Sequence, residues 1–241
     1  MFQKDHKHFQ AICAANGLTL SYAYNKQTLY LLKSIFEDRE YADFFPFYES
    51  AIIVDVGAHY GYFSIFAHLN SDKSSRIFAI EPDPTNFTLL QKNLFDQRIE
   101  NVKSLNVAVS AEVGETSLYL GNSVNSSLIA NYALNEVKAD SIPVRTSTLA
   151  QIIVEEKLSR IDFLKLDCEG AEYAILLDAD SVAFENVTTI SMEFHDLKDA
   201  RFTGNVLSEK LVKMGFRIVK FHYEKTTRGL NFGKIIATRL L

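Results

Sequence analysis

Four carboxylates stand at or near the ends of short apolar runs, and an imidazole lies beside the last of them: Asp55, Glu81, Asp167, Glu193 and His195. The runs are rich in β-branched residues, which is typical of strands buried on both faces of a parallel sheet. Ligands bind outside the carboxyl ends of such strands. The spacing therefore predicts that these side chains meet at one rim of a sheet, where they could bind a ligand or move a proton.

The loop after the first run contains Gly57 and Gly61, which allow a tight turn and bring backbone N–H groups close to a ligand. No register of this loop supplies the G-x-G-x-x-G pattern of dinucleotide sites. The carboxylate of Asp55 is also unfavourable for phosphate and suits a cationic ligand. S-adenosylmethionine carries an ammonium group and no phosphate, so we expect this cofactor rather than NAD.

Each part of this cofactor has a predicted set of contacts. Asp55 and the backbone of 57–61 would hold the methionine part, Glu81 the ribose hydroxyls, and the region around Val109 the adenine. Asp167 would lie beside the transferred methyl group. The predicted cofactor-binding residues are Asp55, Gly57, Ala58, His59, Tyr60, Gly61, Glu81, Pro82, Ala108, Val109 and Asp167.

Three residues are candidates for catalysis: Asp167, Glu193 and His195. Because alternate residues of a strand point the same way, Glu193 and His195 share one face. They could act as a base on a hydroxyl or, together with Asp167, ligate a divalent cation such as Mg²⁺ or Mn²⁺, and the spacing leaves both alternatives open. Asp167 has a further alternative, as the N-cap of a following helix. We interpret Cys168 as a small buried residue rather than a nucleophile.

Strands and helices alternate along most of the chain, which indicates a parallel sheet with right-handed crossovers. We expect helices at 61–70, 84–95 and 205–214, and strands at 51–56, 76–81, 103–109, 161–167, 187–194, 216–222 and 233–238. The connection between the last two strands is too short for a helical crossover and indicates an antiparallel pair. The predicted fold class is α/β: a Rossmann-like, seven-stranded, mostly parallel sheet with an antiparallel C-terminal hairpin and helices on both faces.

We divide the chain into an N-terminal helical or lid segment, 1–50, and a single α/β domain, 51–241, which carries a β-hairpin and loop insertion at 110–147. Within the insertion, the pattern predicts a strand at 114–121, a polar loop at 122–127 and an edge strand at 141–146. The edge position is expected because Pro143 cannot donate to a ladder.

Composition excludes several classes of protein. The 241 residues are 47% hydrophobic and 23% charged, which is close to globular averages. A net charge of −5 is unlike that of nucleic-acid-binding proteins. No apolar run is long enough to span a bilayer. The start of the chain does not resemble a secretory signal, so we expect a cytoplasmic protein with no membrane or nucleic-acid partner. The two cysteines are expected to be free thiols, and no pattern indicates an oligomeric state.

Four motifs together resemble the FkbM-type S-adenosylmethionine-dependent methyltransferases. They are Asp-x-Gly-Ala-x-x-Gly-x-Phe-Ser at 55–64, Glu-Pro-x-Pro-x-x-x-x-x-Leu-x-x-Asn at 81–93, Leu-Lys-Leu-Asp-Cys-Glu-Gly-Ala-Glu at 164–172 and Glu-Phe-His at 193–195. The resemblance covers about residues 50–220. It implies the seven-stranded methyltransferase fold and methyl transfer to a hydroxyl of a sugar, polyketide or other small metabolite. The chain departs from the family pattern at His59-Tyr60 and at 148–150, where an acid is often found.

We therefore expect an S-adenosylmethionine-dependent methyltransferase that methylates a hydroxyl of a small metabolite or glycan. N-methylation stays open as an alternative. A second alternative is an inactive nucleoside-binding or interaction module that keeps the methyltransferase fold, although the intact motifs argue against loss of function.

Overall fold

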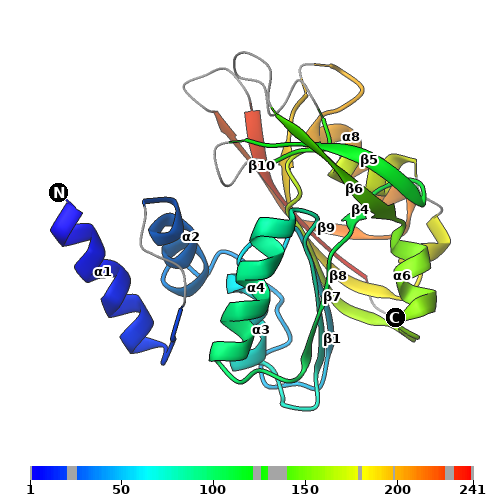
Figure 1. Cartoon of the computed structure of the whole chain (residues 1–241). Coiled ribbons are helices and arrows are strands. Elements are labelled where there is room, and N and C mark those ends of the chain that lie inside the picture. The colour runs from blue at the N-terminus through cyan, green and yellow to red at the C-terminus, as the bar shows by residue number, and fades with distance from the viewer. Residues whose placement is uncertain are drawn as a thin grey trace.

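The computed structural model describes residues 2–20, 26–121, 126–129, 140–178, 181–197, 199–225 and 231–239 (Figure 1). Its central strands are β1 Ile52–Val56, β2 Arg76–Ile80, β3 Val102–Leu105, β7 Ile161–Leu166, β8 Val187–His195, β9 Arg217–Lys225 and β10 Asn231–Thr238. They form one seven-stranded sheet in the order β3-β2-β1-β7-β8-β10-β9. Among these strands only β10 is reversed, because it pairs antiparallel with both β8 and β9. The predicted mostly parallel sheet with an antiparallel C-terminal hairpin is confirmed.

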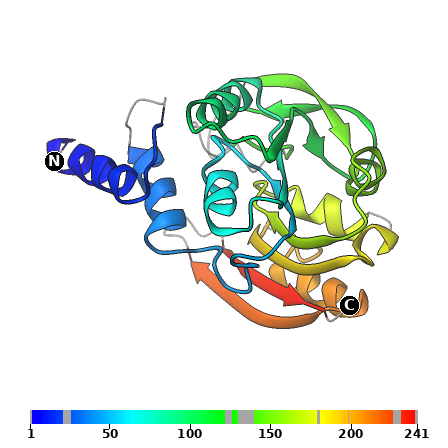
Figure 2. The same ribbon diagram turned by 90° about the horizontal axis from the view of Figure 1, so that it is seen from below.

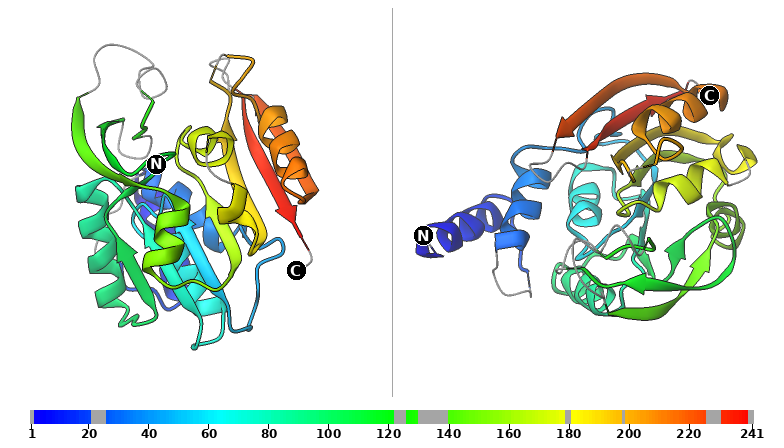
Figure 3. Two further views of the ribbon diagram at one scale, coloured as in Figure 1. Left: turned by 90° about the vertical axis from the view of Figure 1, so that its right-hand side faces the viewer. Right: turned by 90° about the horizontal axis from the view of Figure 1, so that it is seen from above.

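Helices cover both faces of the sheet, as predicted (Figure 3). One face carries α3 Tyr62–Asn70 and α4 Pro84–Asp96, with α2 Lys26–Phe36 beside α3 and α1 Phe2–Ala15 beside α2. The other face carries α6 Leu149–Glu155, α7 Glu172–Leu177 and α8 Gly204–Lys213. A short 3-10 helix, η1 Ser181–Phe184, precedes β8.

The alternation of side chains along the strands separates two apolar cores. Val54 and Val56 pack into the core under α6 to α8, whereas Ile53 packs into the core under α1 to α4. Asp55 therefore points to the same face as Ile53. The same alternation along β7 and β8 directs the charged side chains Lys165, Glu193 and His195 to this face.

The loops after β1 and β2 are shaped by local chemistry. Gly61 precedes α3 in the left-handed conformation, with φ 81°. Asp83 caps α4 by accepting the N–H groups of Thr85 and Asn86, and Pro84 occupies the first turn, where its missing N–H costs nothing. This cap ends the extended chain soon after Glu81 and holds the carboxyl end of β2 in place.

The predicted strand 103–109 is in fact two strands in different sheets. After β3 the chain leaves the main sheet at Asn106, whose side chain donates to the carbonyl groups of Glu81 and Pro82. It then forms β4 Ala108–Val109, which belongs to a second, three-stranded sheet. The prediction of one continuous strand was wrong because these side-chain contacts break the ladder.

The second sheet has the order β4-β6-β5, where β5 is Gly114–Tyr119 and β6 is Ser141–Ser147. The prediction of an edge strand at 141–146 was wrong, since β6 is the middle strand. However, β4 pairs only with Thr146 and Ser147, so it stops short of Pro143. The proline is therefore tolerated in a middle strand. Most of the predicted polar loop 122–127 lies outside the described residues.

The N-terminal segment reaches the sheet through α2, which packs on α3, while α1 extends away from the body of the molecule (Figures 1 and 2). Of the aromatic residues at 41–48, Tyr41 and Phe45 are buried in the core under α3, and Phe44 and Tyr48 are exposed. The division at residue 50 stays a prediction. Within the described ranges, no helix has the length and apolar character needed to cross a bilayer.

Candidate active site

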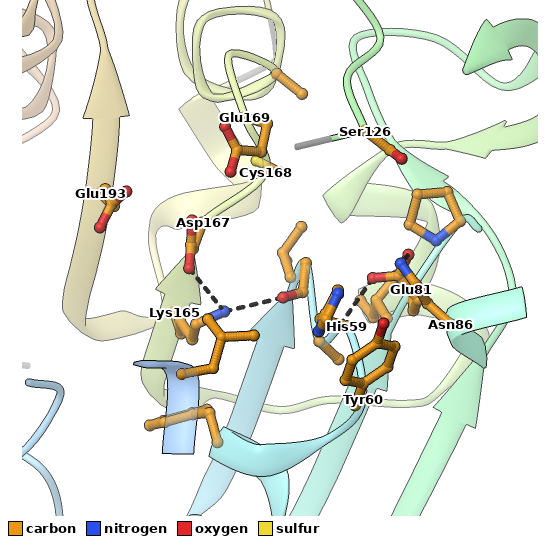
Figure 4. Close-up of a pocket in the computed structure, with 18 of the residues that line it drawn as sticks. His59, Tyr60, Glu81, Asn86, Ser126, Lys165, Asp167, Cys168, Glu169 and Glu193 are labelled. Atoms are coloured by element: carbon orange, nitrogen blue, oxygen red, sulfur yellow. Dashed lines mark hydrogen bonds and ion pairs between the residues drawn. The ribbon is translucent and has the colours of Figure 1, made fainter. Parts of the chain in front are cut away.

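A cavity of about 510 Å³ opens at the carboxyl ends of β1, β2, β7 and β8 (Figure 4). It brings together most of the residues predicted from the sequence: Gly57, Ala58, His59, Tyr60, Glu81, Pro82, Ala108, Val109, Asp167, Glu193 and His195. Asp55 and Gly61 are not among the residues that line it. Glu81, Asn86 and Tyr60 lie on one side of this cavity, and Asp167, Glu193 and Glu169 on the other (Figure 4).

The turn after β1 depends on Gly57. Its φ of 78° lies in the left-handed region, and a Cβ atom at this position would lie 1.8 Å from the carbonyl oxygen of Asp167. The N–H groups of Gly57 and Ala58 both donate to the carbonyl of Ile80, at 3.0 Å. The loops after β1 and β7 can therefore approach this closely only because residue 57 has no side chain.

Glu81 lies where the turn meets β2. Its carboxylate accepts the N–H groups of His59 at 2.8 Å and of Asp83 at 3.0 Å. The side chain is buried, and burial raises its pKa to about 7 in spite of these two hydrogen bonds. Glu81 thus has oxygens at the cavity wall that could accept further hydrogen bonds from hydroxyl groups of a ligand.

Asp55 lies beneath the cavity rather than on its surface. Its carboxylate is fully buried, accepts the hydroxyl of Ser64 at 2.7 Å and pairs with the ammonium of Lys165 at 3.0 Å. Asp55 is not among the residues that line the cavity, and its carboxylate instead holds Lys165, which donates to the loop at Gly57. The contact of Asp55 with the methionine part stays a prediction.

Lys165 is the residue of this site that sequence reasoning missed most clearly. Its ammonium donates to the carbonyl oxygen of Gly57 at 3.0 Å and lies 3.6 Å from Oδ2 of Asp167. Burial by itself lowers the pKa of this lysine, but the carboxylates of Asp55 and Asp167 outweigh burial and raise it. Lys165 is thus a permanent buried cation between β1 and β7. The available signal in the sequence was that Lys165 lies between two acids, Asp162 and Asp167, along one predicted strand.

Asp167 faces the cavity from the end of β7. Its Oδ2 accepts the hydroxyl of Tyr41 at 2.9 Å. Burial raises the pKa of Asp167, but the neighbouring cations, Lys165 first, lower it overall. The N-cap alternative for Asp167 was wrong, because α7 begins later, after Ala171, with no side-chain cap.

The loop between Asp167 and α7 is held by Glu172 instead. This fully buried carboxylate accepts the N–H of Cys168 at 2.9 Å and that of Gly170 at 2.8 Å. Burial and the carboxylate of Glu172 raise the pKa of the Cys168 thiol well above its usual range. The thiol is therefore protonated at neutral pH, in agreement with the prediction that Cys168 is not a nucleophile.

Glu193 and His195 share one face of β8, as predicted, and contact each other. Nε2 of His195 lies 3.2 Å from Oε1 of Glu193 and 3.7 Å from Oε2 of Glu169. Burial lowers the pKa of His195, but the surrounding carboxylates raise it to about 10. Burial and the charge of Asp167 raise the pKa of Glu193 to about 6. At neutral pH the imidazole is therefore protonated and the carboxylate is largely ionised.

The end of the cavity near the second sheet is apolar. Ala108 and Val109 are both buried there, and Leu118 and Leu128 pack around them. A flat, uncharged ring system would bury its faces here without leaving a charged group unpaired.

No group of three His, Cys, Asp or Glu residues is arranged to hold a metal ion within the described part of the chain. The three residues named as possible ligands instead contact other protein groups. Asp167 is held by Tyr41 and Lys165, and Glu193 and His195 contact each other.

Comparison with known proteins gives consistent matches. Residues 55–218 match the model of the methyltransferase FkbM domain. The chain is 26% identical over 216 residues to the 31-O-demethyl-FK506 methyltransferase FkbM of Streptomyces tacrolimicus, covering 77% of this chain and 81% of that protein. It is 29% identical over 229 residues to the AMB antimetabolite synthetase AmbE of Pseudomonas aeruginosa, covering 80% of this chain. The matched part is only 11% of the length of AmbE.

A solved structure, that of human methyltransferase 10 domain containing protein, resembles this fold with a TM-score of 0.55. The likeness covers 99% of this chain and 97% of that chain, at 12% sequence identity. At this identity the likeness concerns the fold alone.

Proposed function

The chain belongs to the FkbM methyltransferase family, and on this premise we propose that it transfers the methyl group of S-adenosylmethionine to a hydroxyl group of a small metabolite or glycan. The observation that carries the proposal is the cavity at the carboxyl ends of the parallel strands, with the buried carboxylate of Glu81 at one side and the ionised Asp167 and Glu193 at the other.

The residues of this cavity fit S-adenosylmethionine. Ala108 and Val109 would contact the adenine, and Glu81 would accept the ribose hydroxyls. The carboxylate of Asp167 would attract the positive charge of the methionine part or accept the hydroxyl of the methyl acceptor. The turn at Gly57 supports the fit, because a residue without a side chain lets the ligand lie close to the backbone there.

When bound, S-adenosylmethionine supplies an electrophilic methyl group; the protein must align the acceptor hydroxyl and remove its proton. We assign proton removal to Glu193, because a carboxylate with a pKa of about 6 is ionised at neutral pH and is a better base than an ordinary glutamate. Oε1 of Glu193 contacts His195, so Oε2 is the oxygen to which we assign the proton.

His195 has a different role from the base that its side chain first suggests. Protonated at neutral pH, it cannot accept a proton, but it donates to Glu193 and places a positive charge beside the reacting groups. Hydroxyl oxygen becomes more negative as its proton leaves, and a fixed cation nearby stabilises that change.

Two measurements test this proposal. Calorimetric titration of the full chain with S-adenosylmethionine should release or absorb heat with a single binding transition, and NAD should give none. In the second, incubation of cell extract with the protein and methyl-labelled cofactor should give a labelled metabolite, and mass spectrometry should identify a methyl ether. Labelled N-methyl products would contradict methylation of a hydroxyl. If S-adenosylmethionine does not bind, the proposed methyl transfer is excluded, and the alternative of an inactive module with the methyltransferase fold remains.

A variant separates binding from chemistry. Glu193→Gln keeps the size of the side chain but removes the base, so label transfer should fall about 100-fold, a typical loss for general base catalysis, while the Kd for S-adenosylmethionine changes little. Glu185→Gln, at an exposed position before β8, is the matched control and should transfer label at the wild-type rate.

A further inference from the structure

Several side chains of the cavity come from outside the segment that matches the family model, and Tyr41 is the one that contacts Asp167. Tyr41 precedes residues 55–218 and belongs to the N-terminal segment between α2 and β1. It is nevertheless almost fully buried, at 4% exposure, and lines the same cavity as Asp167. The hydroxyl of a buried tyrosine usually forms a hydrogen bond. In Tyr41 the partner of this hydroxyl is a residue of the candidate active site.

The hydroxyl of Tyr41 donates to Oδ2 of Asp167 at 2.9 Å. The ammonium of Lys165 lies 3.6 Å from the same oxygen, which is long for a direct hydrogen bond. Tyr41 is therefore the closer of these two donors to Asp167. Because both groups approach Oδ2, the other oxygen, Oδ1, is the one that we assign to a ligand.

The ring of Tyr41 is fixed by cations on two strands. The ammonium of Lys234 lies 4.1 Å from the ring centroid and that of Lys165 lies 5.3 Å from it. The edge-to-face contact with Phe63, with centroids 5.2 Å apart, adds a third restraint. Cation–π contacts of this kind are stronger when they are withdrawn from water, so the ring has little freedom to turn its hydroxyl away from Asp167.

Lys234 is itself held in place by the segment that carries Tyr41. It donates to the carbonyl oxygen of Glu40, and its ammonium lies 3.8 Å from the carboxylate of the same residue. Lys234 is also paired in register with Glu193 across β10 and β8. The N-terminal segment and the C-terminal hairpin thus meet at Tyr41, directly beside Asp167.

We propose that Tyr41 is a positioning residue of the active site, whose hydroxyl holds Oδ2 of Asp167 so that Oδ1 faces the ligand. The contact itself does not depend on the activity, whereas its consequence for catalysis rests on the proposed methyl transfer. Burial raises the pKa of the Tyr41 phenol well above its usual range, so the phenol is a donor at every physiological pH. The N-terminal segment is accordingly part of the catalytic unit rather than only a cover for the sheet.

A double-mutant cycle tests the proposal with the variants Tyr41→Phe and Asp167→Ala, alone and combined, in the full chain, because alanine leaves the Tyr41 hydroxyl no side-chain acceptor at position 167. Phenylalanine keeps the ring between the two lysines and removes only the hydroxyl. In the wild-type background, Tyr41→Phe should change the unfolding equilibrium constant about tenfold, because a buried hydrogen bond to a charged group is lost. In the Asp167→Ala background the same substitution should change it about twofold or less.

The control is Tyr48→Phe, which removes a hydroxyl from a side chain that is 78% exposed. It should change the unfolding equilibrium constant by less than about twofold in both backgrounds, as expected for a surface position. Equal effects of Tyr41→Phe in the two backgrounds would overturn the proposal, because the hydroxyl would then act independently of Asp167. This readout needs no cofactor and no acceptor.

A second readout addresses catalysis. Tyr41→Phe should lower the rate of label transfer about tenfold, and the loss of rate should disappear in the Asp167→Ala background. A loss of rate of the same size in both backgrounds would contradict positioning of Asp167. If the wild-type protein transfers no label, the proposed function fails, and the unfolding cycle still decides whether Tyr41 holds Asp167.

Discussion

The two sides of the cavity are built in different ways (Figure 4). One side, which we call the loop half, consists of residues 57–60, Glu81, Pro82, Ala108 and Val109. Its geometry comes from backbone N–H groups and tight turns between successive elements. The other side, the charged half, consists of Glu40, Tyr41, Lys165, Asp167, Glu193 and His195, which distant segments bring together through side-chain charges. Lys234 supports this half from outside the cavity wall, through its contacts with Glu40 and Tyr41.

The difference matters because the two halves respond to different changes. Backbone geometry in the loop half depends on the absence of a side chain at one position and on one buried carboxylate. The charged half depends on the balance of charges, so the removal of a single charge leaves its partners buried without compensation. Four experiments, in order of the expected effect, test this comparison.

The largest effect is expected for Lys165→Met, which removes the cation that joins the two halves. Asp55 would then be a fully buried carboxylate without its ion pair. Loss of one partner of a buried pair costs about 3–5 kcal/mol, and urea-induced unfolding measures it. The control is Lys103→Met, whose ammonium pairs with Glu156 at 2.7 Å but whose side chain is 58% exposed; its loss should be below about 1 kcal/mol. Equal losses would show that burial does not govern these pairs.

The second effect concerns pH and the loop half. The folded-state pKa of Glu81 is raised to about 7 by burial, from 4.5. Neutral Glu81 is therefore favoured by folding, and its contribution is fully present below about pH 4.5 and is lost as the pH rises through 7. Relative to Glu81→Gln, which stays neutral, the wild-type protein should lose on the order of 3 kcal/mol of stability across this window.

Unfolding free energies measured in parallel for the two proteins at several pH values give the difference directly. A difference that is constant from pH 4.5 to 7 would contradict the raised pKa. Asp72→Asn is a suitable comparison, because Asp72 is exposed and its pKa is lowered by Ser74. Any contribution of Asp72 should have the opposite sign, present above its ordinary pKa and lost as the pH falls.

The third effect tests the close approach of the loops. Gly57→Ala would place a Cβ atom 1.8 Å from the carbonyl oxygen of Asp167, at a φ of 78° that alanine disfavours. The turn must shift, so we expect the affinity for S-adenosylmethionine to fall by about 100-fold, equal to about 2.7 kcal/mol, in a calorimetric titration. Gly17→Ala is the matched control, since Gly17 has a similar φ of 65° but no atom within 4 Å of the added Cβ. If both variants bind normally, the cofactor does not lie against this turn.

The same contrast explains what the sequence could predict. The loop half follows from local patterns: apolar runs, glycines at Gly57 and Gly61, an acid at the end of β2 and a proline at the start of α4. These determine backbone conformation over a few residues. Of the predicted cofactor-binding residues, the structure places all but Asp55 and Gly61 at the cavity wall. The mostly parallel sheet with its antiparallel C-terminal hairpin was likewise predictable from the alternation of helices and strands, whereas the order of the seven strands was not predicted.

The charged half was predictable only in part. Asp167, Glu193 and His195 belong to strand ends and were identified, but Tyr41 and Lys234 reach them through contacts across most of the chain length. No local pattern reports such contacts. The break of the predicted strand 103–109 has the same origin, because it depends on hydrogen bonds from Asn106 back to the β2 loop. The protonation state of His195 could not be predicted either, because it depends on the surroundings of the imidazole. Three nearby carboxylates raise its pKa and make it a cation rather than the expected base.

The smallest effect is expected for His195→Gln, which keeps a donor near Glu193 but removes the charge. If His195 acts as a fixed cation, the rate of label transfer should fall about tenfold, or about 1.4 kcal/mol, while the Kd for S-adenosylmethionine stays within about twofold. The folded-state pKa of His195 is raised to about 10, from 6.5. Its charge therefore contributes stability that is fully present below pH 6.5 and is lost as the pH rises through 10.

The control for this variant is His8→Gln. His8 also pairs with a glutamate, Glu37, at 2.8 Å, but both side chains are at least 40% exposed. It should leave label transfer unchanged, because neither residue of the pair lines the cavity and water screens the pair. If His195→Gln instead abolishes label transfer while Glu193→Gln leaves it at the wild-type rate, the imidazole is the base after all. The charged half would then work through proton transfer by His195 rather than through a fixed positive charge.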